Sequence, residues 1–203
     1  MKLRLKICGV KDQARELATL EPDYLGFIFY DKSPRYFQSY IPALDDRIRR
    51  VGVFVNEDPQ RILALKEQHN LDILQLHGDE SQEDCAALRS EAEIWKVFGL
   101  NRDFDFNELT PYLSVVDMFL FDTKSEARGG TGKTFDWKVL HDYHHDKPFM
   151  LSGGIGPEHA SEIKSLKKEF PLLYGIDINS RFELGPGQKD IERIKRFEDE
   201  LSR

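Results

Sequence analysis

The sequence predicts an α/β fold, a single-domain (β/α)8 TIM barrel with short loops that spans residues 1–203. Short runs of β-branched and aromatic residues recur eight times, and each is followed by turn residues and a segment of helical periodicity. The 203 residues allow about 25 residues for each unit, which suffices for a barrel with short connections. A doubly wound open sheet has the same alternation, but no G-x-G-x-x-G loop follows the first strand, which favours the barrel.

Each predicted element is recognised by its length and pattern. The predicted strands are Leu3–Ile7, Tyr24–Phe29, Arg50–Val55, Ile73–Leu76, Ile94–Phe98, Phe119–Phe121, Phe149–Leu151 and Leu173–Ile178. The predicted helices are Lys11–Leu20, Ile41–Arg49, Pro59–His69, Ser81–Ser90, Phe106–Leu113, Asp136–Tyr143, Pro157–Lys168 and Asp190–Leu201.

Several helix starts carry their own chemical signals. Asp58 and Gly156 each precede a proline, which is well suited to the first helical position. Ser81 is a candidate N-cap before an acidic first turn. These signals support the division into strand and helix units.

Composition limits the classes of function. The net charge of -7 and the pI near 5.4 argue against a nucleic-acid partner, because phosphate backbones are bound by clustered Lys and Arg. No apolar run approaches the ~20 residues of a membrane helix, and the amino terminus lacks a signal-peptide core. We therefore expect a cytoplasmic protein with no membrane partner.

The two cysteines, Cys8 and Cys85, are too few for a disulfide framework and fit a reducing compartment. No Cys/His cluster has zinc spacing, so no metal is expected. Cys85 lies inside the fourth helix pattern and is expected to be a small core residue.

The carboxyl ends of barrel strands and the loops after them form the active face of this fold. Cys8 ends the first strand and is followed by Gly9, which lets the backbone turn away and leaves the thiol at the barrel mouth. A thiol placed there suits abstraction of a proton from carbon. Free cysteine is also among the most buried residue types, so a structural role stays open.

Asp122 ends the apolar run 118–121, and nearby apolar surface favours the protonated, proton-donating form of a carboxyl. An N-cap or loop-bracing role is the alternative. The glycine-rich segment 128–133 follows, and it is either a mobile lid or a plain surface loop. Arg35, stiffened by Pro34, offers a planar fork suited to a carboxylate, with a surface salt bridge as the alternative.

Two segments near the carboxyl terminus are suited to phosphate binding. Gly153 and Gly154 can expose backbone N–H groups, and the S-x-x-E pattern from Ser180 to Glu183 predicts a capping box that starts a short helix after Asn179. A barrel phosphate site is commonly formed by the loops after strands seven and eight with a helix amino terminus. Such a site would explain how an acidic protein binds a dianion.

These residues together resemble the phosphoribosylanthranilate isomerase family, and the resemblance runs nearly end to end. The matching pieces are Lys6–Gly9, Ser33–Arg35, Gln75–Gly78, Phe121–Thr123, Gly129–Gly132, Phe135–Trp137, Ser152–Ile155, Asp177–Glu183, Gly187 and Lys189–Asp190. The chain departs from the family pattern at Asn179, where serine is common, and at Arg181 and Phe182, where a small residue is usual.

The resemblance implies a cofactor-independent aldose-ketose isomerase of tryptophan biosynthesis. Its reaction is the Amadori rearrangement of N-(5′-phosphoribosyl)anthranilate to 1-(2-carboxyphenylamino)-1-deoxyribulose 5-phosphate. By the same resemblance, Cys8 is the general base, Asp122 the general acid and Arg35 the partner of the anthranilate carboxylate. The remaining substrate-binding residues that it implies are Gly153, Gly154, Asp177, Asn179 and Ser180.

Other phosphate-binding barrels are the nearest alternatives. The aminoaldose isomerase of the histidine pathway is expected to have an aspartate where Cys8 stands, and indole-glycerol-phosphate synthase typically relies on lysines and glutamates at its strand ends. A non-catalytic phosphosugar-binding barrel would keep the two phosphate loops without needing both Cys8 and Asp122. The implied partner in each case is a small phosphosugar.

Overall fold

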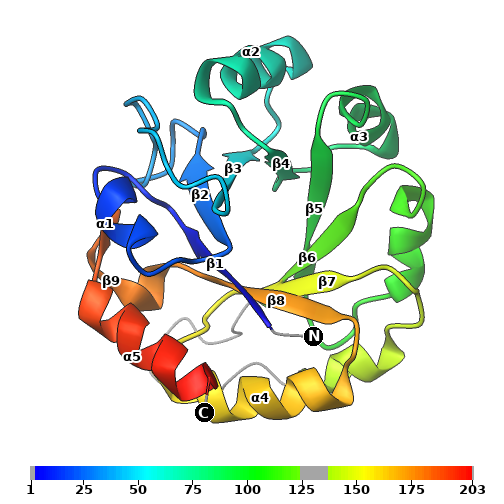
Figure 1. Ribbon diagram of the computed structural model, residues 1–203. Coiled ribbons are helices and arrows are strands. Elements are labelled where there is room, and N and C mark those ends of the chain that lie inside the picture. The colour runs from blue at the N-terminus through cyan, green and yellow to red at the C-terminus, as the bar shows by residue number, and fades with distance from the viewer. Residues whose placement is uncertain (1–2, 124–136, 203) are drawn as a thin grey trace.

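Eight parallel strands close into a barrel in which each strand pairs with the next and β8 pairs back with β1 (Figure 1). The computed structural model describes residues 3–123 and 137–202. The barrel strands are β1 Arg4–Cys8, β2 Tyr24–Ile28, β3 Arg49–Phe54, β4 Ile73–Leu76, β5 Glu93–Leu100, β6 Met118–Thr123, β7 Phe149–Ser152 and β8 Leu173–Ile178. All eight predicted strands are therefore confirmed, and closure of the sheet excludes the doubly wound alternative.

Helices surround the barrel on its outer side (Figure 1). The α-helices are α1 Ala14–Ala18, α2 Pro59–His69, α3 Gln82–Leu88, α4 Ala160–Glu169 and α5 Ile191–Ser202. The 3-10 helices are η1 Phe106–Tyr112, η2 Trp137–Asp142, η3 Pro157–His159 and η4 Ser180–Phe182. A small antiparallel hairpin, β9 Glu183–Gly185 with β10 Gln188–Lys189, lies between β8 and α5. Within the described ranges, no helix is long and apolar enough to cross a membrane.

The predicted helix Ile41–Arg49 is wrong. This segment is irregular up to the start of β3. Pro42 disfavours helical geometry at the residue before it. Asp45 accepts a hydrogen bond from the backbone N–H of Arg47 at 2.9 Å, a local turn that competes with helix formation. The second unit of the barrel consequently connects β2 to β3 without a helix.

The predicted helices near 106–113 and 136–143 are 3-10 helices rather than α-helices. In η1, Pro111 lies inside the segment, where it cannot donate a backbone hydrogen bond and its ring would crowd the carbonyl four residues earlier in an α-helix. The predicted glycine-rich lid at 128–133, just before η2, lies outside the described residues.

The predicted helix starts are confirmed at α2 and α3. Asp58 accepts hydrogen bonds from the backbone N–H groups of Gln60 and Arg61, with proline at the first helical position. Ser81 and Asp84 form a reciprocal capping box. These caps fix the residues at which the loops after β3 and β4 end and the helices begin, and the two loops form part of the barrel mouth.

Side chains alternate between the two faces of each strand, so every second residue points into the barrel. A buried cluster distinct from the outer core fills much of the interior and consists of Tyr24, Val51, Ile73, Trp95, Val97, Met118, Leu120 and Met150. Nearer the carboxyl ends of the strands, the interior positions include polar or small residues such as Cys8, Gly26 and Asp122, together with the apolar Val53. The apolar cluster therefore supports a polar mouth.

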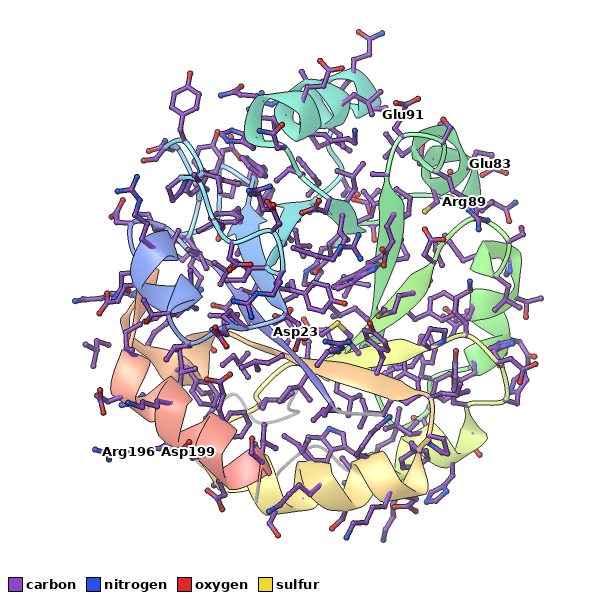
Figure 2. The ribbon with its side chains drawn as sticks, viewed as in Figure 1. Asp23, Glu83, Arg89, Glu91, Arg196 and Asp199 are labelled. Carbon is purple, nitrogen blue, oxygen red and sulfur yellow. The ribbon has the colours of Figure 1, made fainter. Side chains whose placement is uncertain are left out.

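The outer layer joins the sheet to the helices. Cys85 of α3 is fully buried there, which confirms its predicted place in the core, and burial raises the pKa of its thiol to about 11. Charged side chains such as Glu83, Arg196 and Asp199 lie on the exposed outer side of α3 and α5 (Figure 2).

Closure of the barrel depends on a close approach between β8 and β1. A Cβ atom added to Gly175 would lie 2.6 Å from the backbone oxygen of Arg4, which is closer than real Cβ atoms come. We predict that Gly175→Ala lowers the free energy of unfolding by about 1–3 kcal/mol through overpacking. Gly185→Ala is the matched control, because no atom lies within 4 Å of its added Cβ. Urea midpoints of the two variants test this, and equal stability would show that the strands adjust freely.

Candidate active site

The two predicted proton-transfer residues, Cys8 and Asp122, lie on the inward faces of β1 and β6, at or near the carboxyl ends of these strands. Cys8 is the last residue of β1 and is only 4% exposed. Gly9 follows with a left-handed φ of 72°, which turns the chain sharply out of the strand, as predicted. Asp122 lies near the end of β6 on the same inward face as Met118 and Leu120, and its side chain is 29% exposed. Both groups therefore belong to the barrel mouth.

Cys8 lies beside a buried ion pair. Lys6 Nζ donates to Asp177 Oδ2 at 2.8 Å, and both side chains are buried. Burial raises the pKa of the Cys8 thiol, although the positive charges of Lys6 and Lys189 oppose this. Burial also raises the pKa of Asp177 against the opposing effect of Lys6. The predicted substrate residue Asp177 is thus engaged with β1 through one of its two oxygens.

Asp122 has a polar neighbour from the loop after β4. His77 Nε2 lies 3.4 Å from Asp122 Oδ2, and both side chains are partly exposed. His77 also acts electrostatically on Asp177, which links the two sides of the mouth. An imidazole at this distance can exchange a proton with the carboxyl or steady its orientation.

The guanidinium group of Arg35 donates hydrogen bonds to the carboxylate of Glu183. Arg35 Nε lies 3.0 Å from both carboxylate oxygens, and Nη2 donates to Oε2 at 2.6 Å. Glu183 also accepts from Lys189 Nζ at 2.8 Å. Burial favours the neutral acid, but the hydrogen bonds from Arg35 and Lys189 outweigh it and lower the pKa of Glu183. Arg35 therefore faces an internal carboxylate.

This ionic cluster lies next to Gly9, which follows β1. A Cβ atom added to Gly9 would lie 2.7 Å from Arg35 Cδ and 2.8 Å from Asn179 Oδ1. Asn179 in turn accepts from Lys189 Nζ at 2.8 Å. The loops after β1, β2 and β8 are thereby packed together around Gly9.

The two predicted phosphate loops have different local structures. Gly153 and Gly154 both have left-handed φ angles, 82° and 63°, and an added Cβ at Gly154 would meet no atom within 4 Å. The backbone there faces open space, as an anion cradle requires. Asn179 and Ser180 follow β8, and the Ser180 side chain is exposed.

The predicted capping box from Ser180 to Glu183 is wrong. The short helix is only the 3-10 turn η4, and it has no side-chain cap. Glu183 is instead the first residue of β9, and its carboxylate accepts hydrogen bonds from Arg35 and Lys189. Hydrogen bonds from two cations stabilise a buried carboxylate more than one hydrogen bond from a backbone N–H. A helix amino terminus therefore contributes less to this site than predicted.

Two of the three departures from the family pattern, Arg181 and Phe182, have structural roles. Phe182 is fully buried and packs on Phe197 of α5, with ring centroids 4.9 Å apart. Arg181 forms an exposed ion pair with Glu158, which joins η4 to η3 across the two phosphate loops. Both residues fix the loops from outside rather than obstruct the space over Gly154.

A second buried ion pair braces the loop that carries His77. Glu80 accepts from the backbone N–H of Asn56 and Gly78, and Lys96 Nζ lies 3.2 Å from Glu80 and donates to the Gly78 carbonyl at 2.8 Å. Both side chains are buried between the sheet and the helices. The position of His77 is consequently set by a rigid loop.

No role was predicted for Lys6, His77 or Lys189, and Glu183 was predicted only as part of a capping box, although all four fall within the family motifs. A signal for Lys6 was present: it is two residues before Cys8, so the period of two places both on one face of β1. Lys189 and Glu183 are cross-strand partners in the β9–β10 hairpin, an element that was not among those predicted. Among the described residues, no group of three or more His, Cys, Asp or Glu is arranged to hold a metal ion.

Known proteins with similar sequences and structures belong to one enzyme family. The family model described as N-(5'phosphoribosyl)anthranilate (PRA) isomerase matches residues 5–200. A relative from Parabacteroides distasonis, named N-(5'-phosphoribosyl)anthranilate isomerase, is 41% identical over 202 residues, which cover 95% of this chain and 90% of the relative.

Two solved structures extend the comparison to three dimensions. The phosphoribosyl anthranilate isomerase from Thermus thermophilus matches with a TM-score of 0.85 at 28% identity, over 98% of each chain. Another phosphoribosyl anthranilate isomerase, solved in complex with reduced 1-(o-carboxyphenylamino)-1-deoxyribulose 5-phosphate, matches with a TM-score of 0.81 at 30% identity, again over 98% of each chain.

The ion pairs of Glu183 with Arg35 and Lys189 lead to a prediction about the stability of the folded protein. Glu183→Gln keeps the size of the side chain but leaves the fully buried Lys189 without its counter-charge, so the free energy of unfolding at pH 7 should fall by about 3–5 kcal/mol. Glu158→Gln is the control, because the Glu158–Arg181 pair is about half exposed and should contribute only about 0–1 kcal/mol.

The same variant has a predicted pH dependence. Folding lowers the pKa of Glu183. The contribution of this carboxylate to the free energy of unfolding is therefore complete above the pKa of the unfolded state, about 4.3, and is lost as the pH falls through the lower pKa of the folded state. The stability gap between wild type and Glu183→Gln, measured by urea unfolding, should therefore narrow below about pH 4.3. A small gap that is independent of pH would contradict the assigned cluster.

Proposed function

The chain belongs to the N-(5′-phosphoribosyl)anthranilate isomerase family, and we propose that it performs this aldose-ketose isomerisation with Cys8 as general base and Asp122 as general acid. The reaction is the Amadori rearrangement of N-(5′-phosphoribosyl)anthranilate in tryptophan biosynthesis. The observation that carries the assignment is the placement of a thiol and a carboxyl on the inward faces of β1 and β6, at the end of the barrel that the proposed phosphate loops border.

The chemistry requires two proton transfers. Asp122 donates a proton to the ribose ring oxygen as the bond from C1′ to that oxygen breaks, which gives an open-chain iminium ion. Cys8 as thiolate removes the C2′ proton, and the electron pair forms the C1′–C2′ double bond of an enolamine while the iminium is neutralised. Return of a proton to C1′ and loss of the C2′ hydroxyl proton give the ketose. The iminium acidifies the C2′ proton, so a thiolate is a sufficient base.

Substrate orientation comes from groups remote from the bonds that change. The left-handed backbone of Gly153 and Gly154, which is open at Gly154, and the residues Asn179 and Ser180 after β8 are proposed to hold the phosphate. Binding energy from the phosphate then fixes the ribose over Cys8. Asp177 is proposed to contact the ribose from β8, with its Oδ1 oxygen, which has no hydrogen-bond partner among the described residues.

The setting of the reaction follows from the same features. We propose that the enzyme acts in the cytoplasm on a free phosphosugar and uses no cofactor, metal, nucleic acid or membrane. Two unpaired cysteines, Cys8 and Cys85, support a reducing compartment.

The activity and the base are tested together by following the loss of phosphoribosylanthranilate fluorescence. Wild type should turn over without added metal and be unaffected by a chelator. Cys8→Ser should lower kcat by about 100-fold to 10,000-fold, because a hydroxyl is too weakly acidic to supply a base near neutral pH. The urea midpoint of this variant should change little.

Cys85→Ser is the matched control for the cysteine test. It places a hydroxyl in the fully buried layer under α3 and should cost on the order of 1 kcal/mol of stability, with kcat near wild type. Near-normal turnover in Cys8→Ser, or a kcat loss confined to Cys85→Ser, would remove Cys8 from the mechanism.

Arg35 is proposed to recognise the anthranilate carboxylate from its place between Gly9 and Glu183. Arg35→Ala should weaken binding of a product analogue by about 2–5 kcal/mol if the charge pair is desolvated. An analogue without the carboxylate should bind wild type and variant about equally. Calorimetric titration distinguishes this from a bracing role, in which Arg35→Ala would weaken both analogues by the same factor through release of Glu183.

A further inference from the structure

Lys6 is a fully buried lysine that the proton transfers do not use directly. It lies on the same inward face of β1 as Cys8, two residues earlier, and its side chain is 0% exposed. A Cβ atom added to Gly26 of β2 would lie 3.0 Å from Cys8 Sγ and 3.1 Å from Lys6 Nζ. The sulfur and the ammonium therefore converge on the same point above Gly26, where only glycine leaves room for both.

The stability of the barrel does not explain why the charged side chain of Lys6 is buried. Burying an ion pair has a large desolvation cost, and apolar residues of similar volume often serve a fold equally well. The interior below is filled by apolar side chains such as Val51, Ile73 and Leu120. A lysine retained beside a thiol in such surroundings indicates a role in the chemistry of that thiol.

On the basis of the proposed function, we infer that Lys6 and Asp177 set the ionisation of Cys8. The Lys6 ammonium stabilises the thiolate through direct proximity, and Asp177, bonded to Lys6 Nζ at 2.8 Å, holds the ammonium in place and limits its effect. Lys6 is thus a positioning residue that acts on the reaction through Cys8, and Asp177 acts on Cys8 in the same way through Oδ2, in addition to the proposed contact of its Oδ1 with the ribose.

The charges that face Cys8 come from three elements. Lys6 lies on its own strand, Asp177 on β8 and Lys189 on β10, whereas β2 contributes only the uncharged Gly26. Burial opposes the charge on Lys6, but Asp177 and Cys8 outweigh it and raise the pKa of Lys6, so the ammonium persists. Burial lowers the pKa of Lys189 despite its contact with Glu183, which makes Lys189 the weaker of the two cations beside the thiol.

The opposite signs of Lys6 and Asp177 make the inference testable. Lys6→Met removes the cation with little change in length and should raise the pKa of Cys8. Asp177→Asn removes the negative charge but keeps the shape, so the ammonium acts on the thiol unopposed and the pKa of Cys8 should fall. A purely structural role for either residue would shift the pKa in neither direction, or in the same direction for both variants.

The direct measurement is ultraviolet titration of thiolate absorbance in a Cys85→Ala background, where Cys8 is the remaining thiol of the two in the chain. The same background with Cys8→Ser supplies the blank. We expect an upward shift of at least about one pKa unit in Lys6→Met, which is a tenfold smaller thiolate fraction at neutral pH, and a downward shift in Asp177→Asn. If Lys6→Met does not fold, the Asp177→Asn titration alone tests the inference. A lower pKa of Cys8 in this variant supports it, and an unchanged or higher pKa contradicts it.

The pH profile of kcat/KM separates this inference from the proposed function. Its acidic limb should move with the titrated pKa in both variants. Movement of the titration without movement of the profile would support the charge-setting pair and overturn Cys8 as the base. Absence of any shift in the titration would overturn the role of Lys6 and Asp177, and the Cys8→Ser result would still stand for the base.

Discussion

The ion pair between Lys6 and Asp177 is the interaction on which the arrangement of the site depends. These residues are register partners of β1 and β8, the strands whose pairing closes the barrel, and their side chains meet at 2.8 Å inside it. Two charges removed from water are tolerable only when they satisfy each other closely, so the pair fixes the relation of the first strand to the last. Cys8 is the next inward residue on β1, and the geometry that closes the barrel therefore also places its thiol.

Two further buried carboxylates extend this control to the loops. Glu183 joins Arg35 to Lys189 and so connects the loops after β2 and β8 beside Gly9. Glu80 joins Lys96 to the backbone of the loop that presents His77 to Asp122. Each network lies at the carboxyl ends of the strands, where loops would otherwise move freely. Arg35, Lys189 and Lys96 are thus each held against a buried carboxylate.

The strands and the better-capped helices were predictable because their signals are local. The β4 and β8 bounds were predicted without error, and Pro59 and Ser81 mark helix starts whose hydrogen bonds form within three residues. The predicted helix at 41–49 failed because the Asx turn at Asp45 outweighed a weak apolar pattern. The capping box at Ser180 failed because Glu183 pairs with Lys189 across the β9–β10 hairpin, which was not predicted, and with Arg35, which is 148 residues away in sequence and which no local pattern reveals. Cys8 and Asp122 were readable as strand-end residues, whereas the partners that set their chemistry come from other strands.

A crystal structure of this chain with the reduced product analogue, 1-(o-carboxyphenylamino)-1-deoxyribulose 5-phosphate in its reduced form, tests the central claim most directly. We expect Cys8 Sγ within about 3–3.5 Å of the C2′ carbon, as a reactive geometry requires. Asp122 should lie on the ribose side away from β1, the phosphate over Gly153 and Gly154, and the carboxylate against Arg35. A thiol turned away from C2′, with another side chain in its place, would contradict the assignment of Cys8 as the base.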